Sequence, residues 1–203
     1  MFSIFVSPRP ETTNMADTKD IFLTEKIVWF GLDFSRAKMI GQTGFNNPVD
    51  IVNRLFSNWN NIILLEEKKY NLIKFLGKSK IVYDFSVVTR RNKLVQPKEL
   101  VINTDHKISS EDLTTIINDY KSEEYSEGIG LSFIIESFNK FNNQSYLYVC
   151  FFDIESRSIL LAAYMHGKAR GFGIRNFWAN SIHDILTQIG TKKLKKWEKS
   201  CIK

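Results

Sequence analysis

The order of strand-like and helix-like segments predicts an α+β fold, a single domain with a mainly antiparallel sheet of four or five strands and helices packed on it. Three observations support this prediction. The strand-like segments do not alternate strictly with the helix-like ones, as they would in a doubly wound parallel sheet. The last two strand-like segments are joined by a short turn, which is typical of a hairpin. No internal repeat or flexible linker divides the chain.

Composition agrees with one folded domain. The 203 residues are 43% hydrophobic and 25% charged, which excludes a disordered protein, a coiled coil and a disulfide-stabilised miniprotein. No apolar run approaches the ~18–20 residues that a membrane helix needs. The N-terminus lacks the basic region and long apolar stretch of a signal peptide, so we expect a cytoplasmic protein. Cys150 and Cys201 are too few for a multi-cysteine zinc site.

The first half of the chain predicts strands over 26–34 and 81–88, with a short strand extension at 38–40. Gly31, inside the first strand, indicates a bulge or a close backbone approach. Between the two strands, Asn47 and Pro48 have the residue types that begin a helix, and a second helical piece is expected over 66–76. Residues 99–103 are expected to pair at the edge of the sheet.

In the second half, Ser109 followed by Asp112 predicts the start of a helix. A further helix is predicted over 128–142, because its apolar residues recur at helical spacing: Leu131, Ile134, Ile135, Phe138 and Phe141. Strands over 144–153 and 157–166 form the hairpin. A last helix begins near Arg175. Trp59 and Trp178 lie on the apolar stripes of their helices, so we expect both in the core.

The two ends differ in composition from the body. Residues 1–20 are predicted to be a disordered leader, within which Met15 is an alternative start, and residues 21–191 form the domain. Residues 192–203 form a lysine-rich coda that carries +5 of the net charge of +6. The coda is expected to be dispensable for folding, as a solvated helix end or as a contact with an acidic partner.

The densest candidate site is the loop between the last strand and the last helix, residues 166–180. Glycines let a ligand approach the backbone, and the start of a helix offers free N–H groups, so this loop predicts a site for a small anionic ligand. The predicted ligand-binding residues are Asp33, His166, Lys168, Arg170, Gly171, Gly173, Arg175 and Asn176. The alternative is a loop whose glycines only turn the chain.

Two segments resemble an uncharacterised family of small bacterial proteins. They are Trp29-Phe-Gly-x-Asp33-x-Ser35 and Gly171-Phe-Gly-x-Arg175-Asn176-x-Trp178, and the resemblance covers most of residues 24–190. It implies no activity. It implies that the two segments belong to one surface.

Three functions remain open at this point. The first is a non-enzymatic domain that binds a small anion or a protein partner at the 166–180 loop. The second is a hydrolase or transferase that uses Asp33 with His166 or Arg175 in one cleft. The third is nucleic-acid binding through the basic C-terminus, which we consider unlikely because most aromatic residues lie at core spacing. The sequence predicts no catalytic residues, metal ligands or cofactor, and it does not indicate an oligomeric state.

Overall fold

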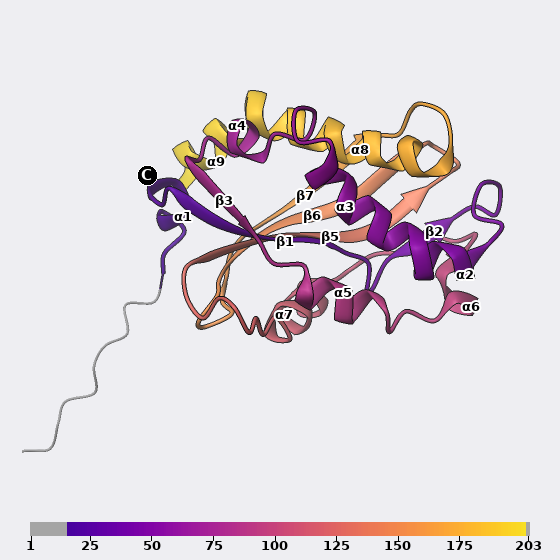
Figure 1. The fold of residues 1–203 in the computed structure, drawn as a ribbon, viewed down its shortest axis with the longest axis horizontal. Coiled ribbons are helices and arrows are strands. Elements are labelled where there is room, and N and C mark those ends of the chain that lie inside the picture. Colours follow the sequence, from indigo (N-terminus) through magenta and orange to yellow (C-terminus); the bar gives the residue numbers. More distant parts are fainter. Residues whose placement is uncertain (1–15, 202–203) are drawn as a thin grey trace, which may run out of the picture.

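A mixed sheet runs through the centre of the computed structural model, which describes residues 16–201 (Figure 1). Its strands are β1 (Lys26–Asp33), β2 (Lys38–Ile40), β3 (Lys80–Tyr83), β4 (Val101–Ile102), β5 (Ile129–Asn139), β6 (Gln144–Asp153) and β7 (Ile159–Lys168). Strand β5 is the axis of the sheet. Along one edge it pairs in parallel with β1 and then with β2, which lie end to end. Strands β3 and β4 pair in parallel with β1 and β2.

The other edge of β5 pairs with β6 in antiparallel register, and β6 pairs with β7 in the same way. The predicted hairpin is therefore confirmed, but the prediction of a mainly antiparallel α+β sheet is wrong. The fold is α/β with a mostly parallel sheet, because residues 129–139 form a central strand instead of the predicted helix. Ten of the eleven residues of β5 are buried. A strand buried on both faces shows no polar alternation, so its apolar spacing imitates a helix.

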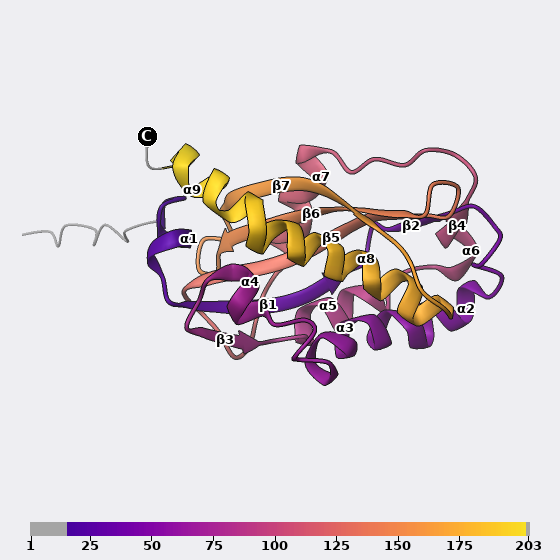
Figure 2. The same cartoon turned by 90° about the horizontal axis from the view of Figure 1, so that it is seen from above.

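Helices cover both faces of the sheet (Figures 1 and 2). One face carries α3 (Phe56–Leu65), α4 (Leu72–Leu76), α8 (Ile174–Gln188) and α9 (Leu194–Cys201), and α8 crosses the sheet obliquely when it is seen from above. The other face carries α5 (Ser86–Asn92) and α7 (Ser110–Asn118). The shorter elements are α1 (Asp20–Leu23), α2 (Pro48–Asp50), α6 (Pro97–Leu100) and the π-type turns η1 (Ile51–Leu55) and η2 (Ile189–Lys193).

Local sequence explains where several helices begin. The Asn47 side chain accepts a hydrogen bond of 3.1 Å from the Asp50 N–H at the start of α2, as predicted. Ser109 and Asp112 form a capping box at the start of α7, which is also confirmed. The predicted strand over 81–88 is too long, because a helix replaces its second half. The Asp84 carboxylate accepts the Ser86 N–H at 2.9 Å and begins α5.

Two hydrophobic cores hold the layers together. The larger one joins α3 and α8 to the sheet and contains Trp59 and Trp178, which are 1% and 2% exposed, so both are core residues as predicted. The smaller one joins α5 and α7 to the opposite face and includes Cys150. Gly31 lies at a register shift in β1 and has a φ of +103°, which confirms the predicted irregularity.

The structure describes part of each predicted end. Residues 1–15 of the predicted leader lie outside the described residues, but Ala16 packs against the larger core and α1 begins at Asp20. The last helix does not end at α8 but continues through η2 into α9. Leu194 and Trp197 in the coda pack against the larger core. We therefore no longer expect the coda to be dispensable for folding.

Candidate functional site

The predicted loop lies between β7 and α8. Gly171 and Gly173 have φ angles of +105° and +76°, and Phe172 between them is 95% exposed. The Asn180 side chain donates a 2.8 Å hydrogen bond to the Arg170 carbonyl and holds the loop against α8. The glycines therefore turn the chain, as the simpler interpretation of this loop requires.

The start of α8 is open to a ligand. Gly173 occupies the N-cap position without a side-chain cap, and the first turn holds no acidic residue. Beside it is a hollow of about 270 Å³. Lys140, whose Nζ lies 4.1 Å from the centre of the Phe177 ring, lines this hollow. The other lining residues are Gly44, Gly171, Phe172, Gly173, Ile174 and Trp178.

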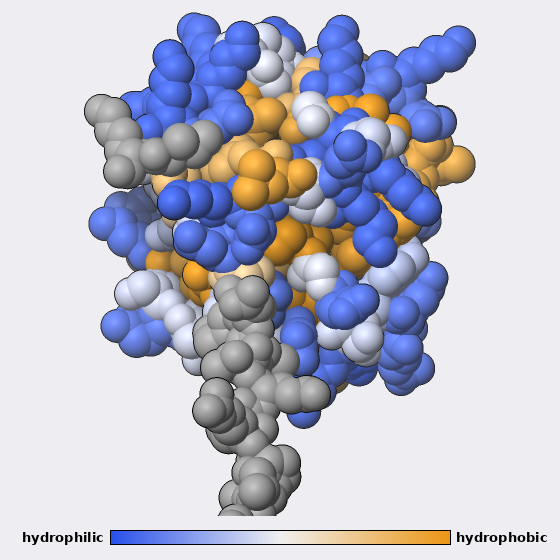
Figure 3. All heavy atoms as spheres, turned by 90° about the vertical axis from the view of Figure 1, so that its left-hand side faces the viewer, coloured by the Kyte–Doolittle hydropathy of each residue, from blue (hydrophilic) through white to orange (hydrophobic). Residues whose placement is uncertain are grey.

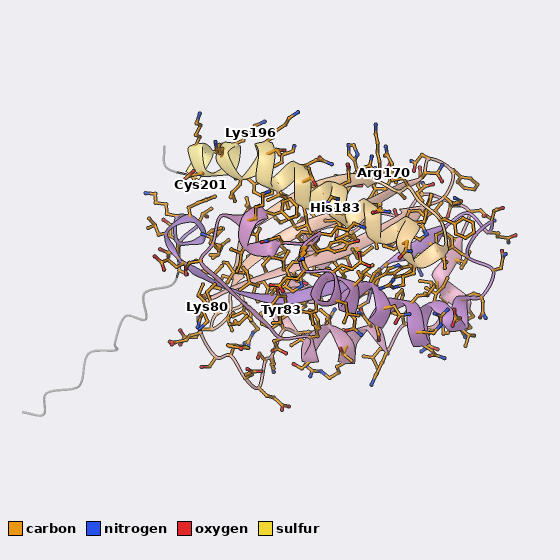
Figure 4. The ribbon with its side chains drawn as sticks, turned by 45° about the horizontal axis from the view of Figure 1, so that its top comes forward. Lys80, Tyr83, Arg170, His183, Lys196 and Cys201 are labelled. Carbon is orange, nitrogen blue, oxygen red and sulfur yellow. The ribbon has the colours of Figure 1, made fainter. Side chains whose placement is uncertain are left out.

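The predicted cations do not gather in that hollow. Arg175 donates to the Asn176 Oδ1 at 3.1 Å and lies 3.9 Å from Glu66, and it does not line the hollow. Lys168 and Arg170 are exposed, and Figure 4 shows Arg170 close to the start of α8. His166 is exposed on β7, with its ring centre 6.1 Å from that of Tyr146.

Asp33 lies elsewhere and is completely buried. Its Oδ2 accepts hydrogen bonds of 2.8 Å from Arg91 Nε and from the Tyr120 hydroxyl, and its Oδ1 accepts one from the Ser35 N–H. Burial and the neighbouring Asp33 charge raise the pKa of Tyr120, so its phenol remains a donor. The structure therefore does not bring Asp33 together with His166 or Arg175, and the predicted catalytic cleft is not formed.

A larger hollow that the sequence did not reveal lies between α3 and α5, beyond the end of β3. Its volume is about 450 Å³. Its lining residues come from η1, α3, α5 and the residues beside α5: Val52, Asn53, Phe56, Ser57, Asn60, Asn61, Phe85, Thr89, Asn92 and Lys93. Since most of these side chains are polar and uncharged, the hollow suits hydrogen bonding to a neutral group.

Two buried amides form the floor of this hollow. Asn60 accepts the Leu32 N–H at 2.7 Å and donates to the Leu32 carbonyl at 3.1 Å. Asn92 accepts the Phe34 N–H at 2.6 Å and donates to the same Leu32 carbonyl at 3.1 Å. The two side chains supply hydrogen-bond partners to backbone N–H and C=O groups beyond Trp29, where the pairing of β1 with β3 has ended. A Cβ at position 31 would collide with the Asn60 Oδ1, so Gly31 allows this close approach.

The walls differ from the floor. Asn53, Ser57, Asn61 and Thr89 are exposed, and their side chains form no hydrogen bonds within residues 16–201. No carboxylate, imidazole or thiol lines the hollow in the described part of the chain. Four asparagines in and beside α3 were a usable signal, since asparagine is a poor helix former. Helix α5, on the other side of the hollow, gave no such signal, because the strand predicted over 81–88 included its first residues.

Comparison of the chain with protein-family models, with curated proteins and with solved structures returns no match. In residues 16–201, no three His, Cys, Asp or Glu side chains are grouped to hold a metal ion. No described helix combines the length and apolar character that crossing a membrane requires. The interpretation of function therefore depends on the geometry of the hollows.

Proposed function

We propose that this protein binds a small, neutral, polyhydroxylated ligand, a nucleoside or a sugar, in the hollow between α3 and α5. One observation carries the proposal. The walls present amide and hydroxyl groups that make no hydrogen bond within the described chain, around a floor whose own amides are hydrogen-bonded to the backbone at Leu32 and Phe34. A fixed floor keeps the geometry of the hollow, while the free wall groups remain available to a ligand.

The position and size of the hollow support the proposal. It lies beyond the carboxyl end of β3 and beside the carboxyl-terminal half of β1, and ligands of α/β proteins commonly bind at this end of parallel strands. Its volume of about 450 Å³ falls within the ~300–1,000 Å³ that is usual for small-molecule sites.

The chemistry of the lining favours binding over catalysis. Amides donate and accept hydrogen bonds, and hydroxyls do both, so the walls match a ligand that carries several of each. The ring of Phe85, partly buried at the inner wall, offers an apolar surface for a base or a sugar face. General acid–base catalysis needs a titratable group within reach, and the lining provides only the ammonium of Lys93.

The test is a binding screen with the four common ribonucleosides and a set of monosaccharides, read by amide NMR shifts. We expect one class to bind the wild type and to bind Asn61→Ala at least tenfold more weakly. Asn118→Ala, an exposed helical asparagine at the end of α7, is the matched control and should bind like the wild type. The proposal fails if neither class binds at millimolar concentration, or if Asn61→Ala binds as well as the control.

The uncapped start of α8 favours a second candidate, a small anion held beside Lys140. Free N–H groups and a cation that line one hollow suit phosphate or sulfate. We expect phosphate, added at constant ionic strength, to raise the melting temperature of the wild type. Lys140→Ala should abolish that rise, and Lys196→Ala, on the distant α9, should keep it. An equal rise in all three proteins would contradict a site at α8.

A further inference from the structure

A separate cleft of about 210 Å³ lies on the face of the sheet opposite α8, beside the loop that precedes α7. There, alternate residues of β7 are exposed, among them Tyr164 and His166, which do not belong to the core under α7. The residues that the inference uses are Asp105, Glu136, Tyr146 and Tyr164, all of which line the cleft.

Glu136 is the unusual member of the cleft. It is 3% exposed, although it lies in the middle of β5. Its Oε1 accepts the Tyr164 hydroxyl at 2.6 Å, and its Oε2 accepts the Ile108 N–H at 2.9 Å. Within residues 16–201, no Lys, Arg or His nitrogen lies within 4.0 Å of this carboxylate, in contrast to the buried Asp33, which pairs with Arg91.

The two donors leave the carboxylate incompletely satisfied. An ionised carboxylate has about four acceptor positions, and the phenol and the amide occupy two of them. A buried carboxylate without a neighbouring cation is costly. Burial and the hydrogen bond to Glu136 raise the pKa of Tyr164, so its phenol stays protonated as the donor.

Tyrosine rings surround the same position. The ring centres of Tyr146 and Tyr164 lie 6.2 Å apart with planes inclined by 21°, and Tyr148 lies 5.0 Å from Tyr164. The face of an aromatic ring carries partial negative charge and attracts cations within about 6 Å. Asp105 adds a second carboxylate to the lining. The lining also includes the ammonium of Lys107 and the imidazole of His106. His106 is engaged with the Arg36 carbonyl at 2.8 Å.

We infer that this cleft binds an organic cation, an alkylammonium or a guanidinium group, whose charge meets Glu136 and whose alkyl part lies against the tyrosine rings. The volume of about 210 Å³ accommodates one such group. The group comes from a free amine or from a lysine or arginine side chain of a peptide. The inference does not depend on the hollow between α3 and α5.

The experiment titrates the full chain, labelled with 13C at the tyrosine ζ position, with butylammonium, butylguanidinium and neutral 1-butanol at constant ionic strength. We expect one or both cations to give saturable shifts of the Tyr146 and Tyr164 signals, and 1-butanol to give none. Glu136→Gln, which keeps the shape of the side chain and removes its charge, should weaken binding at least tenfold. Glu155→Gln, in the exposed β6–β7 turn, is the matched control and should leave it unchanged.

Two further arms keep the test decisive. If Glu136→Gln does not fold, Tyr146→Ala should weaken cation binding severalfold, because it removes one ring from the wall. Nα-acetyl-lysine methylamide should bind more tightly than butylammonium if the source is a peptide side chain, and equally or less tightly if the source is a free amine. Binding of 1-butanol equal to that of butylammonium, or cation binding unchanged in Glu136→Gln, would overturn the inference.

Discussion

The two faces of the sheet are attached to their helices by different interactions. On the α8 face, aromatic rings stack in a continuous apolar core. The ring centres of Phe34 and Phe56 lie 4.3 Å apart, and those of Phe138 and Trp178 lie 4.6 Å apart. On the α7 face the apolar core is smaller, and the buried pair of Asp33 and Arg91 ties the sheet to α5 and α7. The difference indicates that the α8 face supplies most of the stability, while the α7 face holds the buried charges and the open tyrosine cleft.

The largest expected effect is on the apolar face. Trp178→Ala should lower the free energy of unfolding by about 3–5 kcal/mol, because the ring is 2% exposed and its removal leaves a cavity beside Phe138. Chemical denaturation measures this loss. Trp197→Ala, at a partly buried position in α9, should cost less. Unchanged stability of Trp178→Ala would show that the α8 face is not the principal core.

The second prediction concerns the charged face. Arg91→Ala leaves Asp33 buried without its cation and should cost about 3 kcal/mol, at the lower end of the range for a broken buried pair, since the Arg91 side chain keeps 12% exposure. Arg90→Ala is the control, because the neighbouring Arg90 is exposed. Denaturation curves of both variants compare them directly. Equal stability of the two variants would show that the pair of Asp33 and Arg91 contributes no more than a surface ion pair does.

The C-terminal helix gives a smaller effect. Truncation after Thr191 removes the packing of Leu194 and Trp197 and should cost about 2 kcal/mol, since both side chains are partly buried. Helix α9 lies toward the end of the molecule that Figure 3 faces, where apolar surface is interspersed with charged side chains. The control replaces Lys195 and Lys199 with Ala, and it should leave stability unchanged or slightly raised by relieving repulsion. A truncated protein as stable as the whole chain would show that the coda does not contribute to folding stability.

The smallest predicted effect depends on pH. Burial, followed by the charges of Lys69 and Arg170, lowers the pKa of His183 from its usual 6.5. The unfolded chain therefore binds a proton before the folded one does, so this histidine reduces stability as pH falls below about 6.5. Figure 4 shows His183 on α8, and its ring packs against Phe75 at 5.9 Å. His183→Gln should lose less stability than the wild type between pH 7.5 and 5.5.

The sequence allowed prediction of elements whose signals are local. The capping residues Asn47 and Ser109, the hairpin of β6 and β7, and the burial of Trp59 and Trp178 each depend on a few neighbouring residues, and all are confirmed. Strand β5 was predicted as a helix because a strand buried on both faces is apolar throughout. That one error also changed the predicted sheet from mostly parallel to antiparallel.

The candidate sites could be predicted less well, because they join distant segments. Asn60 and Asn92 meet at Leu32 although 32 residues separate them in the chain, and no local pattern shows this. Glu136 meets Tyr164 across β6 in the same way. The predicted 166–180 loop is shorter in the structure, because β7 extends to Lys168 and α8 begins at Ile174. The predicted cations Lys168, Arg170 and Arg175 do not line the hollow beside it.

The amides of Asn60 and Asn92 also complete an open edge of the sheet. A sheet edge that loses its neighbouring strand exposes N–H and C=O groups to which a strand of another molecule can add. Here both amides complete the edge of β1 from within the same chain, at Leu32 and Phe34. An aspartate at either position would accept the N–H and offer no donor to the Leu32 carbonyl. A ligand that entered the hollow would therefore lie against a strand edge whose N–H and C=O groups at Leu32 and Phe34 are already paired.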